Sequence, residues 1–191
     1  MNAHASERRI VLTGFMCAGK STVAHALAAR LNCAMIDTDA ALVERACRSI
    51  EAIIEEDGEA RFRQIERDTL RDILERADAR VVALGGGAWT LAENRALIAA
   101  HDCFSVWLDA PFELCWQRIT NSADARPLAR EREHARELYE ARCAAYQLAS
   151  LRVGVTETRS AEDTAAEIAS IIGQRKFLVE HEGRGEEKAD G

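Results

Sequence analysis

Short apolar runs alternate along the chain with longer segments whose apolar residues recur every three or four positions. The apolar runs, which predict buried strands, cover residues 9–12, 34–36, 81–84, 103–108 and 152–155. The longer segments, which predict helices, cover about residues 20–31, 40–43, 50–54, 59–76, 93–100, 112–118, 133–149 and 161–172. Each predicted strand is therefore followed by at least one predicted helix.

Strands that are apolar throughout and that alternate with helices indicate a parallel sheet covered on both faces. The predicted fold class is α/β, in three α/β/α layers. We expect a single domain over residues 9–173, preceded by a flexible segment at residues 1–8. Residues 120–132 are polar and lack apolar periodicity, which predicts a mobile loop. Residues 174–191 carry little apolar content, so we expect a disordered polar tail.

Composition and charge narrow the classes of partner. The chain has 191 residues, 48% of them hydrophobic and 30% charged, which is ordinary for a globular domain. The net charge of -7 disfavours a nucleic-acid partner. We find no apolar run long enough for a membrane span and no secretory signal, so we expect a cytoplasmic protein with reduced cysteines. The cysteines form no Cys-x-x-Cys pair and the histidines show no ligand spacing, so no zinc site is expected.

A glycine-rich segment follows the first predicted strand. Residues 14–21 read Gly-Phe-Met-Cys-Ala-Gly-Lys-Ser and match the phosphate-loop pattern G-x-x-x-x-G-K-[ST], with a strand ending at Gly14 and a helix opening at Lys20. Glycines let backbone N–H groups approach phosphate oxygens, and the helix N-terminus adds partial positive charge. Lys20 would reach the outer phosphates and the Ser21 hydroxyl would bind Mg²⁺. The segment predicts an ATP site with magnesium but does not name the acceptor, because GTPases and motor ATPases use the same loop.

Two aspartates mark the carboxyl end of the second predicted strand. Asp37-Thr38-Asp39 stands at the edge where open parallel sheets bind ligands. One carboxylate can hold magnesium through water, and the other can accept the proton of a substrate hydroxyl. An aspartate in this place can also cap the following helix. The two roles are compatible, and for Asp39 we favour the catalytic one.

Several further segments resemble the motifs of the shikimate kinase family, in the same order and at nearly the same spacing. Residues 58–66 fit that family's acceptor-binding motif, Gly-Glu-x-x-Phe-Arg-x-x-Glu. The other segments that resemble family motifs are Asp37-Thr38-Asp39, Arg48-Ser49-Ile50, Leu84-Gly85-Gly86-Gly87-Ala88 and Arg126-Pro127-Leu128. The resemblance covers about residues 10–172. It implies a five-stranded sheet in the order 2-3-1-4-5, a mobile lid at about residues 120–132, and a monomer.

The same resemblance implies the reaction and the residues that carry it. The γ-phosphate of ATP would move to the 3-hydroxyl of shikimate, within aromatic amino acid biosynthesis. The nucleotide would contact Gly14, Cys17, Ala18, Gly19, Lys20, Ser21, Thr22, Arg118, Arg126 and Arg159, with Arg118 and the region of Arg159 flanking the adenine. Shikimate would be bound by Asp39, Arg63, Gly85, Gly86, Gly87 and Arg142, with the two arginines on its carboxylate. Ser21 and Asp37 would hold magnesium, and the catalytic residues would be Asp39 as base, Lys20, and Arg126 on the lid.

The chain departs from the family pattern at four places. Cys17 and Cys47 stand where the family commonly has glycine. The segment Arg142-Cys143-Ala144-Ala145-Tyr146 keeps the arginine and tyrosine but lacks the usual Pro-Leu between them, and the lid is about one residue longer. Within the phosphate loop, Cys17 can be a reactive thiol whose oxidation blocks ATP binding, or an inert packed side chain. Both alternatives stay open.

Two rival functions also stay open. The first is another small-molecule kinase, such as a gluconate kinase, which should lack the combination of Asp37, Arg63 and the three consecutive glycines. The second is a non-catalytic nucleotide-binding relative, which should have lost Lys20, Asp39 or Arg126. The chain retains all of these residues.

Overall fold

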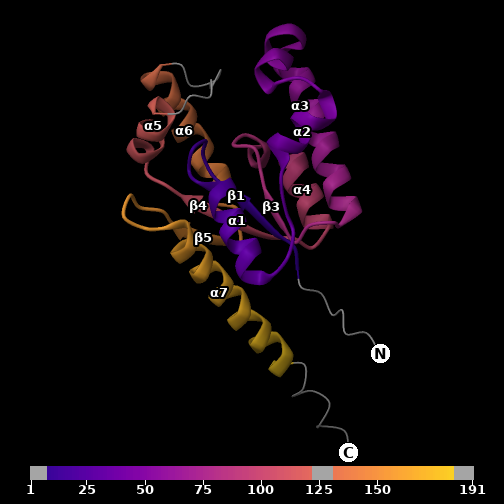
Figure 1. Ribbon diagram of the computed structural model, residues 1–191, viewed down its shortest axis with the longest axis vertical. Coiled ribbons are helices and arrows are strands. Elements are labelled where there is room, and N and C mark those ends of the chain that lie inside the picture. Colours follow the sequence, from indigo (N-terminus) through magenta and orange to yellow (C-terminus); the bar gives the residue numbers. More distant parts are fainter. Residues whose placement is uncertain (1–7, 122–130, 183–191) are drawn as a thin grey trace, which may run out of the picture.

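A computed structural model of the chain describes residues 8–121 and 131–182, with side chains described as far as residue 174 (Figure 1). Five strands form one sheet: β1 Ile10–Thr13, β2 Met35–Asp37, β3 Val81–Ala83, β4 Phe104–Asp109 and β5 Leu151–Gly154. Their spatial order is β2-β3-β1-β4-β5, and each pairing is parallel. The predicted fold class and strand order are therefore confirmed.

Helices follow the strands along the chain and flank the sheet. In the described residues they are α1 Lys20–Leu31, α2 Thr38–Ala46, α3 Ile50–Arg76, α4 Ala92–Ala100, α5 Phe112–Thr120, α6 Arg132–Tyr146 and α7 Ala161–Glu182, with a short 3₁₀ helix, η1, at Ala88–Thr90. Helices α1 and α7 pack against each other, α2 packs on α3, and α5 packs on α6 (Figure 1). The central strands β1, β3 and β4 are buried almost throughout, as expected for a sheet with helices on both faces.

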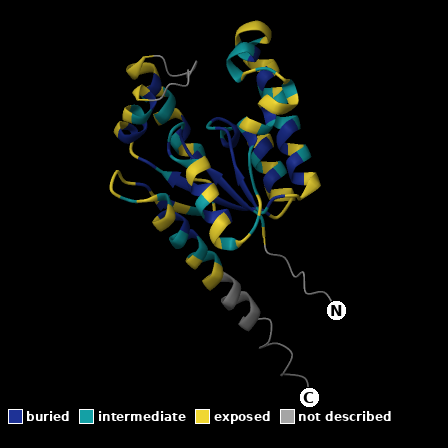
Figure 2. Ribbon diagram, viewed as in Figure 1, coloured by how far each residue is buried: buried dark blue, intermediate teal, exposed yellow. Residues whose placement is uncertain are grey.

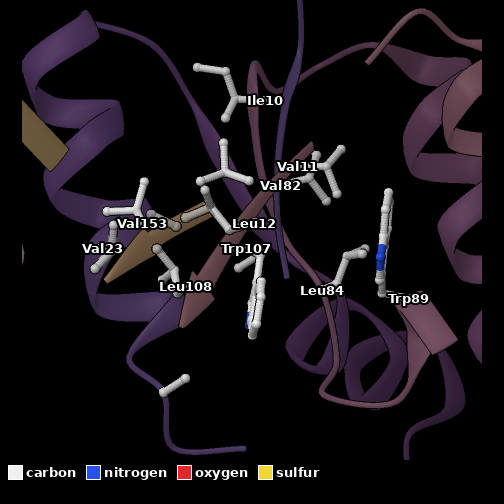
Figure 3. Close-up of a cluster of buried hydrophobic side chains, with 14 of the residues drawn as sticks. Ile10, Val11, Leu12, Val23, Val82, Leu84, Trp89, Trp107, Leu108 and Val153 are labelled. Carbon is white, nitrogen blue, oxygen red and sulfur yellow. The ribbon is translucent and has the colours of Figure 1, made fainter. Parts of the chain in front are cut away.

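The main core is centred on β1, where successive side chains point to opposite faces of the sheet. Leu12 lies on one face with Leu108 of β4 and Val23 of α1 (Figure 3). Val11 lies on the other face, beside Val82 of β3 (Figure 3). The central strands β1, β3 and β4 are accordingly buried almost continuously (Figure 2). Their carboxyl ends are held rigidly, which fixes the loops that follow them.

A second, smaller cluster of apolar side chains lies between α2 and α3. Leu42, Ile53 and Phe62 are its buried members, and they are separate from the main core. Helix α3 is interrupted at Gly58, whose φ of 85° and ψ of 163° are not helical. The break predicted between the helices at about residues 50–54 and 59–76 is therefore confirmed. The segment after Gly58 carries Arg63 and Glu66 of the motif at residues 58–66.

Helix α7 is longer than the sequence pattern predicted. The structure continues it to Glu182, ten residues beyond the expected end at residue 172, so residues 174–182 are helical rather than disordered. Low apolar content predicted a disordered tail. The stretch is nevertheless rich in residues of high helix propensity, namely Gln, Arg, Lys, Leu and Glu, which favour a helix without requiring burial. Residues 1–7 and 183–191 lie outside the described part, so disorder there stays a prediction. None of the described helices combines the length and apolar character that crossing a membrane requires.

Candidate active site

The phosphate loop makes a tight turn between β1 and α1. Gly14 follows β1 with a φ of 142°, and a β-carbon there would lie 2.6 Å from the carbonyl oxygen of Leu108, so only glycine fits. The Ala18 N–H donates to the Phe15 carbonyl at 3.1 Å and closes the loop. Helix α1 then begins at Lys20. Because the first N–H groups of a helix have no helical partners, this geometry forms an anion site.

The ammonium group of Lys20 lies across the phosphate loop. Its Nζ donates to the carbonyl oxygens of Gly14 and Phe15, each at 2.9 Å. Burial lowers the pKa of Lys20, whereas the neighbouring carboxylates of Asp39 and Asp37 act to raise it. The positive charge is thus placed between the loop and two carboxylates. A phosphate group in the loop would offer it a charged acceptor in place of backbone carbonyls.

Asp37 links the first turn of α1 to the first turn of α2. Its Oδ2 accepts a hydrogen bond from the Ser21 hydroxyl. Its Oδ1 accepts from the N–H groups of Asp39 at 2.9 Å and Ala40 at 3.3 Å, which caps α2. The aspartate that caps the helix is therefore Asp37, and Asp39 does not share that role. Ser21 and Asp37 together present the hard oxygen ligands that Mg²⁺ prefers, and this ion usually completes its shell with water and substrate phosphates.

Asp39 lies against the three-glycine turn that follows β3. A β-carbon on Gly85 would lie 2.4 Å from Asp39 Oδ1, so this approach requires glycine. The buried Thr38 hydroxyl accepts a hydrogen bond from the Gly85 N–H at 2.8 Å and joins α2 to the turn. The end of β2 and the end of β3 are thus tied together beside the phosphate loop. The carboxylate predicted as the base lies at their junction.

Arg63 and Glu66 form a charged pair on α3 that also lies against the three-glycine turn. Arg63 Nη1 donates to Glu66 at 2.8 Å, and its Nη2 donates to Glu59 at 3.1 Å. A β-carbon on Gly87 would lie 2.6 Å and 2.7 Å from the two terminal nitrogens of Arg63, so the guanidinium packs directly on the glycine. Burial raises the pKa of Glu66 and outweighs the opposing effect of Arg63, whose own pKa is raised because its two ion pairs outweigh its burial.

Arg142 reaches the turn from α6. Its side chain is buried, and its Nη1 lies 3.7 Å from the place that a β-carbon on Gly86 would occupy. Its guanidinium carbon stands 5.9 Å from the centre of the Phe15 ring in the phosphate loop. The missing Pro-Leu after Arg142 has therefore not moved this arginine away from the site. Two arginines and the carboxylates of Asp39 and Glu66 thus meet at a backbone turn next to the loop.

A cleft of about 460 Å³ runs along the phosphate loop, and residues on its walls come from both ends of the chain. Asp37, Asp39 and Gly86 line one part of it, and Arg118 and Arg159 line another. Arg118 donates to the Cys17 carbonyl at 3.1 Å. Arg159 donates to the Gly154 carbonyl at 3.0 Å and pairs with Glu167. The cleft thus extends from the three-glycine turn at Gly86 to the two arginines predicted near the adenine.

Known proteins resemble the chain in sequence over most of its length. The family model described as shikimate kinase matches residues 16–173. Curated shikimate kinases from Ruegeria pomeroyi and Geobacter sulfurreducens are 38% and 40% identical to the chain, over 93% and 92% of it and 91% and 97% of their own lengths. The chain belongs to the shikimate kinase family. Membership in this kinase family makes it an ATP-dependent phosphotransferase.

A solved structure extends the match to three dimensions. Shikimate kinase from Acinetobacter baumannii in complex with shikimate is similar with a TM-score of 0.83 and 33% identity, over 91% of this chain and 97% of that one. A gluconokinase from Sinorhizobium meliloti reaches a TM-score of 0.58 at 18% identity, a likeness that shows the fold alone. The comparisons therefore favour the shikimate kinase family over the gluconate kinase alternative.

The structure adds two residues to the predicted shikimate kinase site. Glu66 is buried and contacts Arg63, and a β-carbon on Gly85 would lie 3.0 Å from its Oε1. Thr38 holds the Gly85 amide. Sequence reasoning gave neither residue a role, although the three-residue spacing from Arg63 to Glu66 on a helix is that of an ion pair. Arg126, by contrast, lies outside the described residues, and its predicted role stays a prediction.

The two cysteines that replace family glycines both have left-handed backbone. The φ angles are 58° at Cys17 and 52° at Cys47. A side chain with a β-carbon is strained in this region. Glycine is the usual family residue at both positions because it alone adopts this conformation without strain. Cys17 is half-buried, and both of its alternatives, reactive or inert, stay open.

We expect Cys17→Gly to stabilise the protein by about 0.5–1 kcal/mol, because relief of left-handed strain exceeds the entropy that glycine adds to the unfolded chain. The thermal midpoint should rise by about 1–4 °C. Cys17→Ala is the matched control, since it removes the sulfur but keeps the β-carbon, and it should give no gain. An equal rise in both variants would show that the sulfur, not the backbone, is the source of strain.

A larger hollow of about 730 Å³ lies behind Asp37, between α2 and the end of α3. Ile36, Ala41 and Ile73 are among its apolar lining residues. Arg45 and Asp72 at this hollow are paired with each other. The phosphate loop and the three-glycine turn do not contribute to it. Of the predicted site residues that the structure describes, only Asp37 lines this hollow, so it is not the candidate site.

Proposed function

We propose that this protein transfers the γ-phosphate of ATP to the 3-hydroxyl of shikimate, giving shikimate 3-phosphate and ADP. The observation that carries the proposal is the meeting of Asp39, Arg63 and Arg142 around the three-glycine turn, next to the phosphate loop. Shikimate is a small ring with one carboxylate and three hydroxyls. Planar arginine forks suit the carboxylate, and an aspartate that only accepts hydrogen bonds suits a hydroxyl.

Shikimate would be oriented by two arginines at one end and by the Asp39 carboxylate at the other. We assign the shikimate carboxylate to Arg63 and Arg142. The reacting hydroxyl is assigned to Asp39, whose carboxylate lies against Gly85. The backbone of Gly85, Gly86 and Gly87 would line the ring between them. This division holds the hydroxyl toward the phosphate loop, where the reaction needs it.

The proposed transfer follows from these positions. The hydroxyl oxygen attacks the γ-phosphorus, the bond to the bridging oxygen of ADP breaks, and Asp39 takes the hydroxyl proton. Lys20 and the N–H groups of the loop stabilise the negative charge that spreads over the transferring group. Arg126 would add a further positive charge from the lid. Water has to be excluded from the site, since it would otherwise accept the phosphate.

Magnesium would be held by Ser21 directly and by Asp37 through water. When bound, the ion neutralises charge on the β- and γ-phosphates. Arg118 and Arg159 are assigned to the adenine end of the cleft, beyond the loop. We further propose a monomer, because one chain carries the described parts of the site. Placement in the cytoplasm is supported by cysteines that are all free.

Acceptor identity is tested with purified protein, ATP and magnesium in a coupled assay for ADP. Release of ADP is expected only when shikimate is added, because closure around the acceptor assembles the site. Quinate and gluconate, added separately, serve as comparison acceptors. Turnover with gluconate but not with shikimate would refute the proposal. Equal ADP release with no acceptor would show an ATPase rather than a kinase of this specificity.

A further inference from the structure

Tyr146, the last residue of α6, reaches the three-glycine turn with its hydroxyl. The side chain is 1% exposed, and the hydroxyl donates to the Gly86 carbonyl oxygen at 2.6 Å. Its ring stacks on Trp107 of β4, with centroids 6.0 Å apart and planes at 28°. The ring therefore belongs to the core of the protein, while its polar tip touches the proposed acceptor site.

Two further contacts join the same end of α6 to the same turn. Trp89 in η1, which directly follows the turn, donates through Nε1 to the Ala145 carbonyl at 2.9 Å. Arg142 lies one helical turn before Tyr146, and its guanidinium interacts with the Tyr146 hydroxyl. Burial raises the pKa of Tyr146 despite that cation, so the hydroxyl stays protonated and donates throughout the neutral range. Arg142 and the turn are thus held by one tyrosine.

Because a peptide unit is planar, the hydrogen bond from Tyr146 to the Gly86 carbonyl also restrains the neighbouring amide. The Gly86 carbonyl and the Gly87 N–H belong to one trans peptide unit and point in opposite directions. Fixing the carbonyl therefore fixes the amide. Without a partner, a peptide flanked by two glycines rotates easily, because neither residue has a β-carbon to restrict it. Gly87 is also the glycine on which the Arg63 guanidinium packs.

We propose that Tyr146 is a positioning residue for the acceptor: through its hydroxyl it sets the orientation of the Gly86–Gly87 peptide relative to Arg63 and Arg142. The inference rests on the proposed function, because it takes the turn to be the acceptor site. A packing role and a positioning role differ in whether they require the Tyr146 hydroxyl. Packing needs only the ring, which phenylalanine retains, whereas positioning needs the donor.

The test compares Tyr146→Phe with a matched variant on the same helix, Tyr139→Phe. The Tyr139 hydroxyl also donates to a backbone carbonyl, that of Ala110 at 3.1 Å, away from the turn. Tyr146→Phe is expected to raise the KM for shikimate about tenfold, a factor that corresponds to about 1.4 kcal/mol. The KM for ATP should change by less than about twofold, and Tyr139→Phe should leave the shikimate KM unchanged.

A second measurement on ligand-free protein separates this inference from the proposed function. Hydrogen exchange of the amides in residues 84–88 should be faster in Tyr146→Phe than in the unsubstituted protein, and unchanged in Tyr139→Phe. Unchanged exchange in Tyr146→Phe, or an equal shikimate KM rise in both variants, would overturn the positioning role. If the unsubstituted protein did not phosphorylate shikimate, the proposed function would fail, and the exchange result would still decide whether Tyr146 orients the turn.

Discussion

Replacement of Asp39 by asparagine is expected to lower kcat by about 10² or more while ATP binding persists. Asparagine keeps the shape of the side chain but loses the negative charge and the proton acceptor. In the structure the Asp39 carboxylate contacts the acceptor turn at Gly85 and acts electrostatically on Lys20. It therefore stands between the acceptor and the phosphate loop. The measurement is turnover at saturating shikimate and ATP, with a separate titration of nucleotide binding.

The competing account is that Asp39 only orients the hydroxyl, because phosphoryl transfer can be loose and need little help from a base. Near-normal turnover in the asparagine variant would reject the role of base. Asp68→Asn is the control, since Asp68 is an exposed carboxylate on α3 that pairs with Arg71 at 3.2 Å. This variant makes the same chemical change outside the site, and its kcat should not change.

Replacement of Arg63 by alanine is expected to raise the KM for shikimate by a factor equivalent to about 2–4 kcal/mol, which is about 30- to 1000-fold. The reason is the loss of a ground-state partner of the substrate carboxylate, so kcat should fall less than kcat/KM. Arg63→Lys keeps the charge but loses the planar fork, and it should give an intermediate KM. Arg126→Ala should show the opposite pattern, with kcat lowered and KM little changed. An exchange of the two phenotypes would contradict the assigned roles.

The structure adds a consequence for stability that has to be separated from the effect on binding. Glu66 is 2% exposed and pairs with Arg63 at 2.8 Å, so alanine at position 63 leaves a buried carboxyl group without this partner. The double variant Arg63→Ala/Glu66→Gln removes that charge. Its thermal midpoint should recover relative to Arg63→Ala, while its shikimate KM should stay high. Recovery of KM together with stability would show that Arg63 acts only by supporting the fold.

The pH dependence of stability follows from the same carboxyl group. Because burial raises the pKa of Glu66 in the folded protein, the folded state holds this proton more tightly than the unfolded state does. Its contribution to stability is therefore greatest below its ordinary pKa of 4.5 and is lost as the pH rises through the folded value. Loss of Arg63 removes an effect that lowers this pKa. The loss of unfolding free energy in Arg63→Ala, relative to the unsubstituted protein, should thus shrink as the pH is lowered from 7 towards 5. In Arg63→Ala/Glu66→Gln this loss should no longer depend on pH in that range.

The sequence by itself determined those features that depend on residues close together in the chain. Short apolar runs located the five strands. The loop from Gly14 to Ser21 followed from a pattern that needs only a strand before it and a helix after it. Gly58 marked the break in α3 for the same reason, since backbone conformation is a local property. Residue type and its place after the second strand also singled out Asp39, whereas Arg63 was assigned a role only through the resemblance of residues 58–66 to a family motif.

Only the tertiary structure decided which of these groups meet. It showed that Asp37 caps α2 and binds Ser21, that Glu66 is buried against Arg63, and that Tyr146 reaches Gly86 across 60 residues of chain. The contacts of Asp37 with Ser21 and of Tyr146 with Gly86 join separate elements. Their relative placement, like the burial of Glu66, depends on how the helices pack on the sheet, which periodicity does not specify. Spacing along a helix or strand is fixed by local geometry, whereas the distance between two elements is set by the side chains that fill the space between them.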